Sequence, residues 1–115
     1  MKIREFYGQM DGDYEGVLDR FSNEARIGKF VKLFPKDPSY ETLEMHMADN
    51  RIGEAFRAAH CLKGVCLNLG FVQLYESVSF VTEALRAEDP ALASAGMPAL
   101  RREYNKILDA IGKLD

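Results

Sequence analysis

The chain has 115 residues, of which 47% are hydrophobic, and this is enough to bury one core without disulfides or a structural metal. Its net charge of −3 comes from residues spread along the sequence without a Lys/Arg block, so nucleic acid is not an expected partner. No apolar run approaches the ~20 residues of a membrane span, and the N-terminus lacks a signal-peptide core. We therefore expect one cytoplasmic domain over residues 1–115 with no membrane partner.

Apolar residues recur three and four positions apart and strict alternation is missing, which predicts an all-α fold. Residues 1–12 are expected to form a short leading segment. A short helix then runs from Tyr14 to Arg20 with Asp13 as its cap. A second helix spans about 23–34 and ends before Pro35, because proline cannot continue a helix. Its inward-facing residues are Ile27, Phe30, Val31 and Phe34.

A third helix is predicted from a cap at Asp37 or Ser39 to about Ala48. His46 lies within it and is expected to be an ordinary surface or half-buried imidazole, since no Lys-Gly pair accompanies it.

The central helix is predicted over about 51–69, with Asn50 as its cap and Gly70 as a left-handed stop. The next helix spans about 71–87 and buries Leu74, Val78, Val81 and Leu85. Because the connection is short, the two helices form an antiparallel hairpin over about 51–87.

Residues 88–90 interrupt the chain, and the Ala-rich stretch to Gly96 is either a helix start or a loop. The last helix begins near Pro98 and carries an apolar stripe toward the C-terminus. The longer helices with their short connections predict an antiparallel up-down four-helix bundle, covered by short additional N-terminal helices.

The central helix has an unusual outer face. At ~100° per residue, Lys63 and Gly64 lie roughly 60° and 40° to either side of His60. The apolar stripe lies roughly 180° to 280° away, so His60 points out from the core. This stripe comprises Ile52, Ala55, Ala59, Leu62, Cys66 and Leu69.

The same geometry groups Gly53, Phe56, Arg57 and Leu67 around His60, in a partly apolar patch without carboxylates that is typical of a docking surface. Gly64 in mid-helix costs roughly 1 kcal/mol relative to Ala, which suggests that a side chain there would obstruct a partner. The alternative is that Gly64 relieves close helix packing and that Lys63 only solvates the surface.

The two cysteines, Cys61 and Cys66, lie roughly 140° apart on the helix, which prevents a bridge between them. They are expected to be reduced thiols. A zinc site would require His60 and both thiols to converge, but the helix turns Cys66 inward.

The segment His60-Cys61-Leu62-Lys63-Gly64, followed by Gly70, resembles the histidine-containing phosphotransfer (HPt) domain of bacterial and fungal phosphorelays. The resemblance implies that His60 accepts a phosphoryl group, that Lys63 meets its oxygens and that Gly64 leaves room for the partner. Arg57 is a weaker candidate for the same oxygens or for a partner carboxylate. Thr82 stands where several HPt domains carry a glutamine that hydrogen-bonds the imidazole or phosphoryl group. A threonine hydroxyl can donate or accept, so Thr82 is expected to fill this role in a weaker form and to belong to the docking surface.

By the same resemblance, the partners are response-regulator receiver domains and a hybrid sensor histidine kinase. The chain has no nucleotide-binding fingerprint, so we expect a phosphocarrier rather than an enzyme, without a cofactor or metal of its own. Mg²⁺ is expected only on the partner receiver domain. We expect a free-standing monomer.

Two alternatives remain open. The chain could be a non-phosphorylated four-helix adaptor that binds receiver-like signalling partners. It could also be a module of a longer sensor kinase, against which the starting Met1 and the complete bundle argue mildly.

Overall fold

The structure is a computed structural model that describes all of residues 1–115. It contains helices and no strands, which confirms the predicted all-α class. In chain order the elements are α1 (Ile3–Gln9), α2 (Tyr14–Phe21), α3 (Glu24–Leu33), the 3₁₀ helix η1 (Phe34–Lys36), α4 (Ser39–Ala48), α5 (Ile52–Leu69), α6 (Val72–Arg86) and α7 (Pro90–Ile111). None of them combines the length and apolar composition needed to cross a bilayer.

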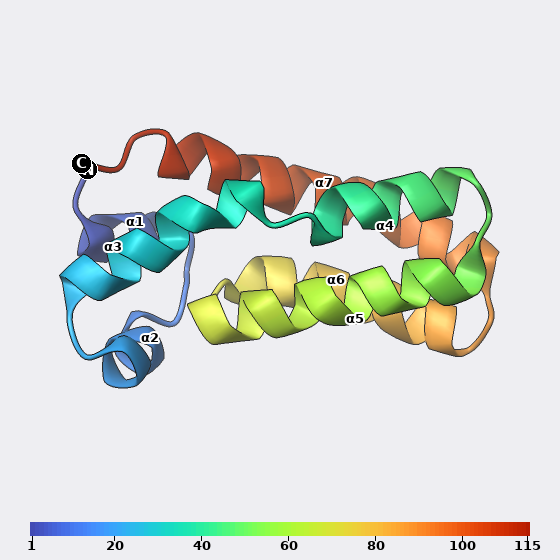
Figure 1. The fold of residues 1–115 in the computed structure, drawn as a ribbon, viewed down its shortest axis with the longest axis horizontal. Helices are drawn as coiled ribbons and strands as arrows, with labels where there is room; N and C mark the ends of the chain where they lie inside the picture. Colours follow the sequence, from blue (N-terminus) through green and yellow to red (C-terminus); the bar gives the residue numbers. More distant parts are fainter.

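Helices α4 to α7 form the up-down bundle, and the whole molecule extends 40 Å in the direction of their axes (Figure 1). Each packs on the next in the chain, so α5 and α7 lie at diagonal corners. The ring stack of Tyr40 on Tyr104, with centroids 3.7 Å apart, closes α7 onto α4. Arg101 adds two hydrogen bonds to the Glu44 carboxylate, at 2.9 and 3.0 Å. The antiparallel hairpin of α5 and α6 agrees with its prediction.

The predicted core stripes are buried with few exceptions. On α5 the buried residues include Ala55, Ala59, Leu62, Cys66 and Leu69, and on α6 they include Leu74, Val78, Val81 and Leu85. Phe30 of α3 was expected inside but is 40% exposed. It lies near the end of the bundle, where its ring packs at 5.0 Å on Phe21 instead of entering the core.

Side chains cap the starts of α2, α3 and α7, whereas α1, α4, α5 and α6 begin without a side-chain cap, and the cap position of α4 is Pro38 rather than the predicted Asp37 or Ser39. The Asp13 carboxylate accepts a hydrogen bond from the Gly16 N–H at the start of α2, as predicted. Gly70 ends α5 with a φ of 69°, a conformation that other residues adopt at a cost. The prediction that Asn50 caps α5 is wrong. Asn50 has a φ of 57° in the preceding turn, and Arg51 takes the cap position without a side-chain bond.

Two boundaries also differ from prediction. The leading segment contains α1, which buries Phe6 and Tyr7 completely or nearly so. Helix α7 starts at Pro90 and continues through Pro98. Proline fits the first turn of a helix, and the Asp89 carboxylate caps it by accepting from the Leu92 N–H, so the Ala-rich stretch is helical.

The N-terminal helices close the C-terminal end of α5. The last carbonyls of a helix have no partner within it and must be satisfied elsewhere. The Tyr7 hydroxyl donates to the buried carbonyl of Leu69 at 2.6 Å. The Asp13 N–H donates to the carbonyl of Gly70 at 3.0 Å, and the Arg20 guanidinium donates to the carbonyl of Leu67 at 3.3 Å. Helices α1 and α2 therefore hold the end of the helix that carries His60.

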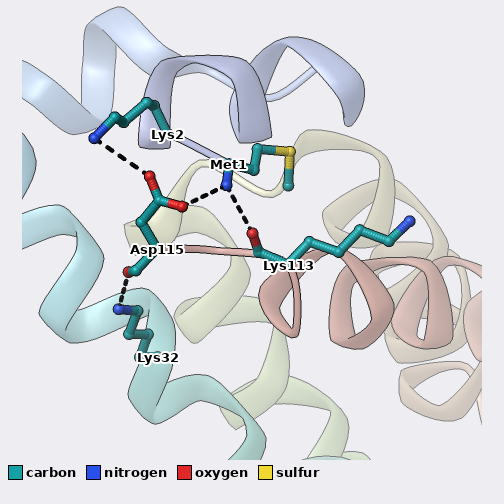
Figure 2. A network of polar contacts seen from close by, with 5 residues as sticks. All are labelled: Met1, Lys2, Lys32, Lys113 and Asp115. Carbon is teal, nitrogen blue, oxygen red and sulfur yellow. Dashed lines mark hydrogen bonds and ion pairs between the residues drawn. The ribbon is translucent and has the colours of Figure 1, made fainter.

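The two chain ends meet beside α1 and α3 (Figure 2). The Met1 ammonium donates to the Asp115 carboxylate at 2.7 Å and to the Lys113 carbonyl at 2.9 Å. Lys2 pairs with the same carboxylate, and Lys32 donates to the main-chain oxygen of Asp115. The Met1 ammonium and Lys2 hold the pKa of the Asp115 carboxyl below its usual range. The contacts link α1 to the end of α7.

We expect Tyr7→Phe to lower the free energy of unfolding by about 1–3 kcal/mol, because the Leu69 carbonyl would stay buried without its donor. Tyr14→Phe is the matched control. Its hydroxyl donates to Glu24 at an exposed position, so its loss is expected to change stability by about 0.5 kcal/mol or less. Urea unfolding measures both variants, and equal stabilities would refute the role of Tyr7.

Candidate functional site

His60 lies in the middle of α5 and its side chain is exposed. The imidazole stacks on the Phe56 ring one turn earlier, with centroids 6.0 Å apart and planes inclined by 23°. The outward orientation expected from the helical pattern is therefore present. Phe56 is half-buried and packs against the core, so its ring links the exposed imidazole to the bundle.

Gly64 is exposed one turn after His60, and a Cβ atom built there would meet no atom of another segment within 4 Å. Close packing against a neighbouring helix therefore does not explain this glycine. Gly53 has equally open surroundings, and Leu67 is 60% exposed. The outer face of α5 thus combines open backbone with an exposed apolar side chain.

Lys63 is half-buried and leans toward α6, where its Nζ atom lies 5.8 Å from the centroid of the Tyr75 ring. It belongs to none of the ion pairs in the structure. An ammonium group over an aromatic ring keeps its charge available to a further anion. Lys63 can therefore pair with an anionic group that approaches the outer face of α5.

Two arginines flank this face and each has a carboxylate. Arg57 pairs with Glu54 at 3.4 Å. Arg86 of α6 lies over the Phe56 ring at 4.9 Å and pairs with Glu83 at 2.8 Å. The prediction that this face has no carboxylates is therefore wrong at its edges, where Glu54 and Glu83 lie.

The carboxylate of Glu83 is held ionised by these neighbours. The hydrogen bond from Arg86, with a smaller contribution from the charge of Lys63, lowers the pKa of the Glu83 carboxyl. Arg86 and Glu83 were absent from the predicted site, because the helical pattern of α5 does not show which residues α6 turns toward it.

Thr82 does not belong to the surface. Its side chain is completely buried, and its hydroxyl donates to the Val78 carbonyl one turn earlier at 2.7 Å. A hydroxyl that bonds its own helix in the core cannot also reach His60 or a docked partner. The predicted docking role of Thr82 is therefore wrong, because this residue lies on the side of α6 that faces the core.

The two cysteines have the opposite orientations predicted for them. Cys61 is exposed beside His60, and Cys66 is buried. Burial raises the pKa of the Cys66 thiol to about 12, so it stays protonated as a small core residue.

This arrangement suits the transfer of a group between proteins. His60 offers a nitrogen nucleophile on an exposed surface, with Lys63 on one side and the open backbone of Gly64 on the other. Phosphoryl transfer needs an in-line nucleophile and compensation for charge on the phosphoryl oxygens. His60 can supply the nucleophile and Lys63 the compensating charge, and the two residues lie within one turn of α5.

A family model described as the Hpt domain matches residues 37–110. The match covers the bundle from α4 nearly to the end of α7, and it includes His60, Lys63 and Gly64. Helices α1 to α3 lie outside it. No curated protein and no solved structure matches the chain.

Proposed function

The chain belongs to the Hpt domain family, whose members carry phosphoryl groups on histidine in phosphorelays, and from this we propose a donor, an acceptor residue and a direction of transfer for it. His60 accepts the phosphoryl group from the aspartyl phosphate of a receiver domain in a hybrid sensor kinase. It then passes the group to the receiver domain of a response regulator.

The observation that best supports this proposal is the exposed imidazole of His60 beside a glycine whose Cβ position is open. A receiver domain must bring the phosphorus of its aspartyl phosphate into line with the ring nitrogen, with only the phosphoryl group between the aspartate and the imidazole, so the two backbones must approach closely. A side chain at residue 64 would stand in that path. The mid-helix glycine therefore has a use that outweighs its cost of roughly 1 kcal/mol.

In the proposed step, the lone pair of His60 Nε2 attacks phosphorus. A P–N bond forms as the P–O bond to the receiver aspartate breaks, and the carboxylate leaves with the electron pair. Attack by the carboxylate of a second receiver reverses these changes and restores the imidazole. Lys63 pairs with the phosphoryl oxygens in both directions. The divalent cation that assists the reaction belongs to the receiver domain.

The test incubates the full chain with a panel of purified receiver domains charged with acetyl phosphate. We expect a phosphate on this chain that is labile in acid and stable in base, as phosphohistidine is, and that mass spectrometry places on residue 60. Binding of a charged receiver without any transfer would refute the carrier and favour a non-phosphorylated adaptor.

Lys63→Ala is expected to slow transfer about tenfold, which corresponds to about 1.4 kcal/mol of lost transition-state stabilisation. Receiver binding should change less than twofold, since the ammonium acts on the phosphoryl oxygens. Lys106→Ala on α7 is the control, because Lys106 is exposed and its helix is diagonal to α5. Rapid-quench kinetics measure the rate, and equal rates for the two variants would remove Lys63 from the mechanism.

A further inference from the structure

Two shallow depressions flank Leu67 at the C-terminal half of α5. The first adjoins the open backbone of Gly64, and the second runs between α2 and the start of α6. Arg20 and Leu67 line both of them. The remaining lining residues are Cys61, Gly64, Val65 and Asn68 in the first, and Asp13, Cys66, Gly70, Val72 and Tyr75 in the second.

The surface between the depressions is apolar and exposed. Leu67 is 60% exposed and Val72 is 37% exposed. Phe56 and Leu67 lie on the same face of α5 as His60, so the apolar strip continues from the imidazole to the start of α6. Helix α2, which lies outside the family match, forms one wall of this strip.

The cations of this surface differ in their partners. Arg57 and Arg86 are paired with Glu54 and Glu83, whereas Lys63 and Arg20 belong to no ion pair. Arg20 is held in place by carbonyl groups instead, since it donates to Gly16 and to Leu67. A guanidinium has five N–H groups, and these two bonds leave three for another acceptor.

We propose that α2 extends the receiver-docking surface beyond the residues of the Hpt match. Arg20 contacts an acidic side chain of the receiver domain, and Leu67 and Val72 pack on an apolar surface of the same domain. This inference rests on the proposed function, because it names a contact of the same docking event. A receiver domain suits the site because this surface is continuous with the face of α5 that carries His60, so a receiver that approaches His60 would also cover it.

Arg20 serves docking and not the chemical step. Its contact at Leu67 lies seven residues from His60, or roughly 10 Å along the helix axis. A guanidinium at that distance cannot meet the phosphoryl oxygens. Its positive charge instead speeds the encounter with an acidic partner and helps to orient the two proteins. Added salt weakens this effect, because it screens the charge.

The experiment compares Arg20→Glu, Arg20→Gln and Arg20→Lys with wild type in transfer from a receiver domain charged with acetyl phosphate. We expect Arg20→Glu to raise the half-saturating receiver concentration about tenfold, Arg20→Gln about threefold, and Arg20→Lys less than about twofold. The rate at saturating receiver should stay within about twofold of wild type in all three. Added salt should narrow the difference between Arg20→Glu and wild type.

Arg102→Glu is the matched control, because Arg102 is exposed, unpaired and on the diagonal helix α7. If the half-saturating receiver concentration rises equally in Arg20→Glu and Arg102→Glu, the inference is overturned, while the proposed function stays intact. A loss in Arg20→Lys as large as in Arg20→Glu, accompanied by a lower urea midpoint, would show a structural role only and overturn it as well. Self-association of wild type that Arg20→Glu abolishes would assign the surface to a second copy. Absence of transfer to wild type from every receiver would overturn the proposed function itself.

Discussion

His60→Gln is expected to abolish phosphoryl acceptance while leaving the protein folded. Glutamine has no nitrogen lone pair that attacks phosphorus, so the step loses its nucleophile and labelling should fall to background. The imidazole is exposed and contacts Phe56 by stacking, and therefore the free energy of unfolding should change by about 0.5 kcal/mol or less. Transfer from a charged receiver measures the first effect, and urea unfolding measures the second.

His46→Gln is the control, because the chain contains two histidines and His46 is the other. It lies half-buried on α4 with its Nδ1 atom enclosed and without a hydrogen-bond partner. It also lies on another helix than the proposed site and has no Lys-Gly pair after it, so this variant should accept phosphate at the wild-type rate. Labelling that survives in His60→Gln and disappears in His46→Gln would place the acceptor on α4 and refute the proposal.

Gly64→Gln is expected to change stability and transfer in opposite directions. A side chain at residue 64 meets open space and removes the conformational cost of a mid-helix glycine, so the protein should gain roughly 0.5–1 kcal/mol. The same side chain would hold the receiver away from His60. Because a displacement of about 1 Å costs roughly a hundredfold in rate, we expect transfer to fall by about that factor.

Gly8→Gln on α1 provides the matched control. Gly8 is also exposed and helical with open surroundings, and it lies far from His60 in the sequence. It should gain similar stability without any loss of transfer. Transfer by Gly64→Gln at the wild-type rate would show that the glycine does not serve the approach of a partner.

The pattern within α5 was predictable because a regular helix fixes the relative directions of its own residues. The spacing of Ala59, Leu62 and Cys66 defines the buried side, and this leaves His60 and Gly64 outside. The same reasoning correctly turned Leu74, Val78, Val81 and Leu85 of α6 into the core.

Contacts between helices were not predictable in this way. Thr82 was placed beside His60 by counting residues, yet its own position on the inner side of α6 follows from the stripe that contains Val78 and Leu85. Arg86 reaches Phe56 because of the packing of α6 on α5, which no periodicity within one helix encodes. Arg20 joins the site through a carbonyl 47 residues later in the chain.

Short helices and helix starts were the other source of error. Helix α1 has seven residues, too few to show a full amphipathic repeat, and its burial of Phe6 and Tyr7 depends on packing from distant segments. The sequence left the Ala-rich stretch before Gly96 open between a helix start and a loop, and the structure shows that the helix has already begun at Pro90.

The bonds that α1 and α2 make to the end of α5 have a consequence for how this protein can be divided. A fragment trimmed to the matched residues 37–110 would keep every atom of His60, Lys63 and Gly64. It would also remove the donors to the carbonyls of Leu69 and Gly70 and the Arg20 contact to the Leu67 carbonyl, two to three turns beyond the imidazole. We therefore expect such a fragment to be less stable than the full chain, even though it contains His60, Lys63 and Gly64.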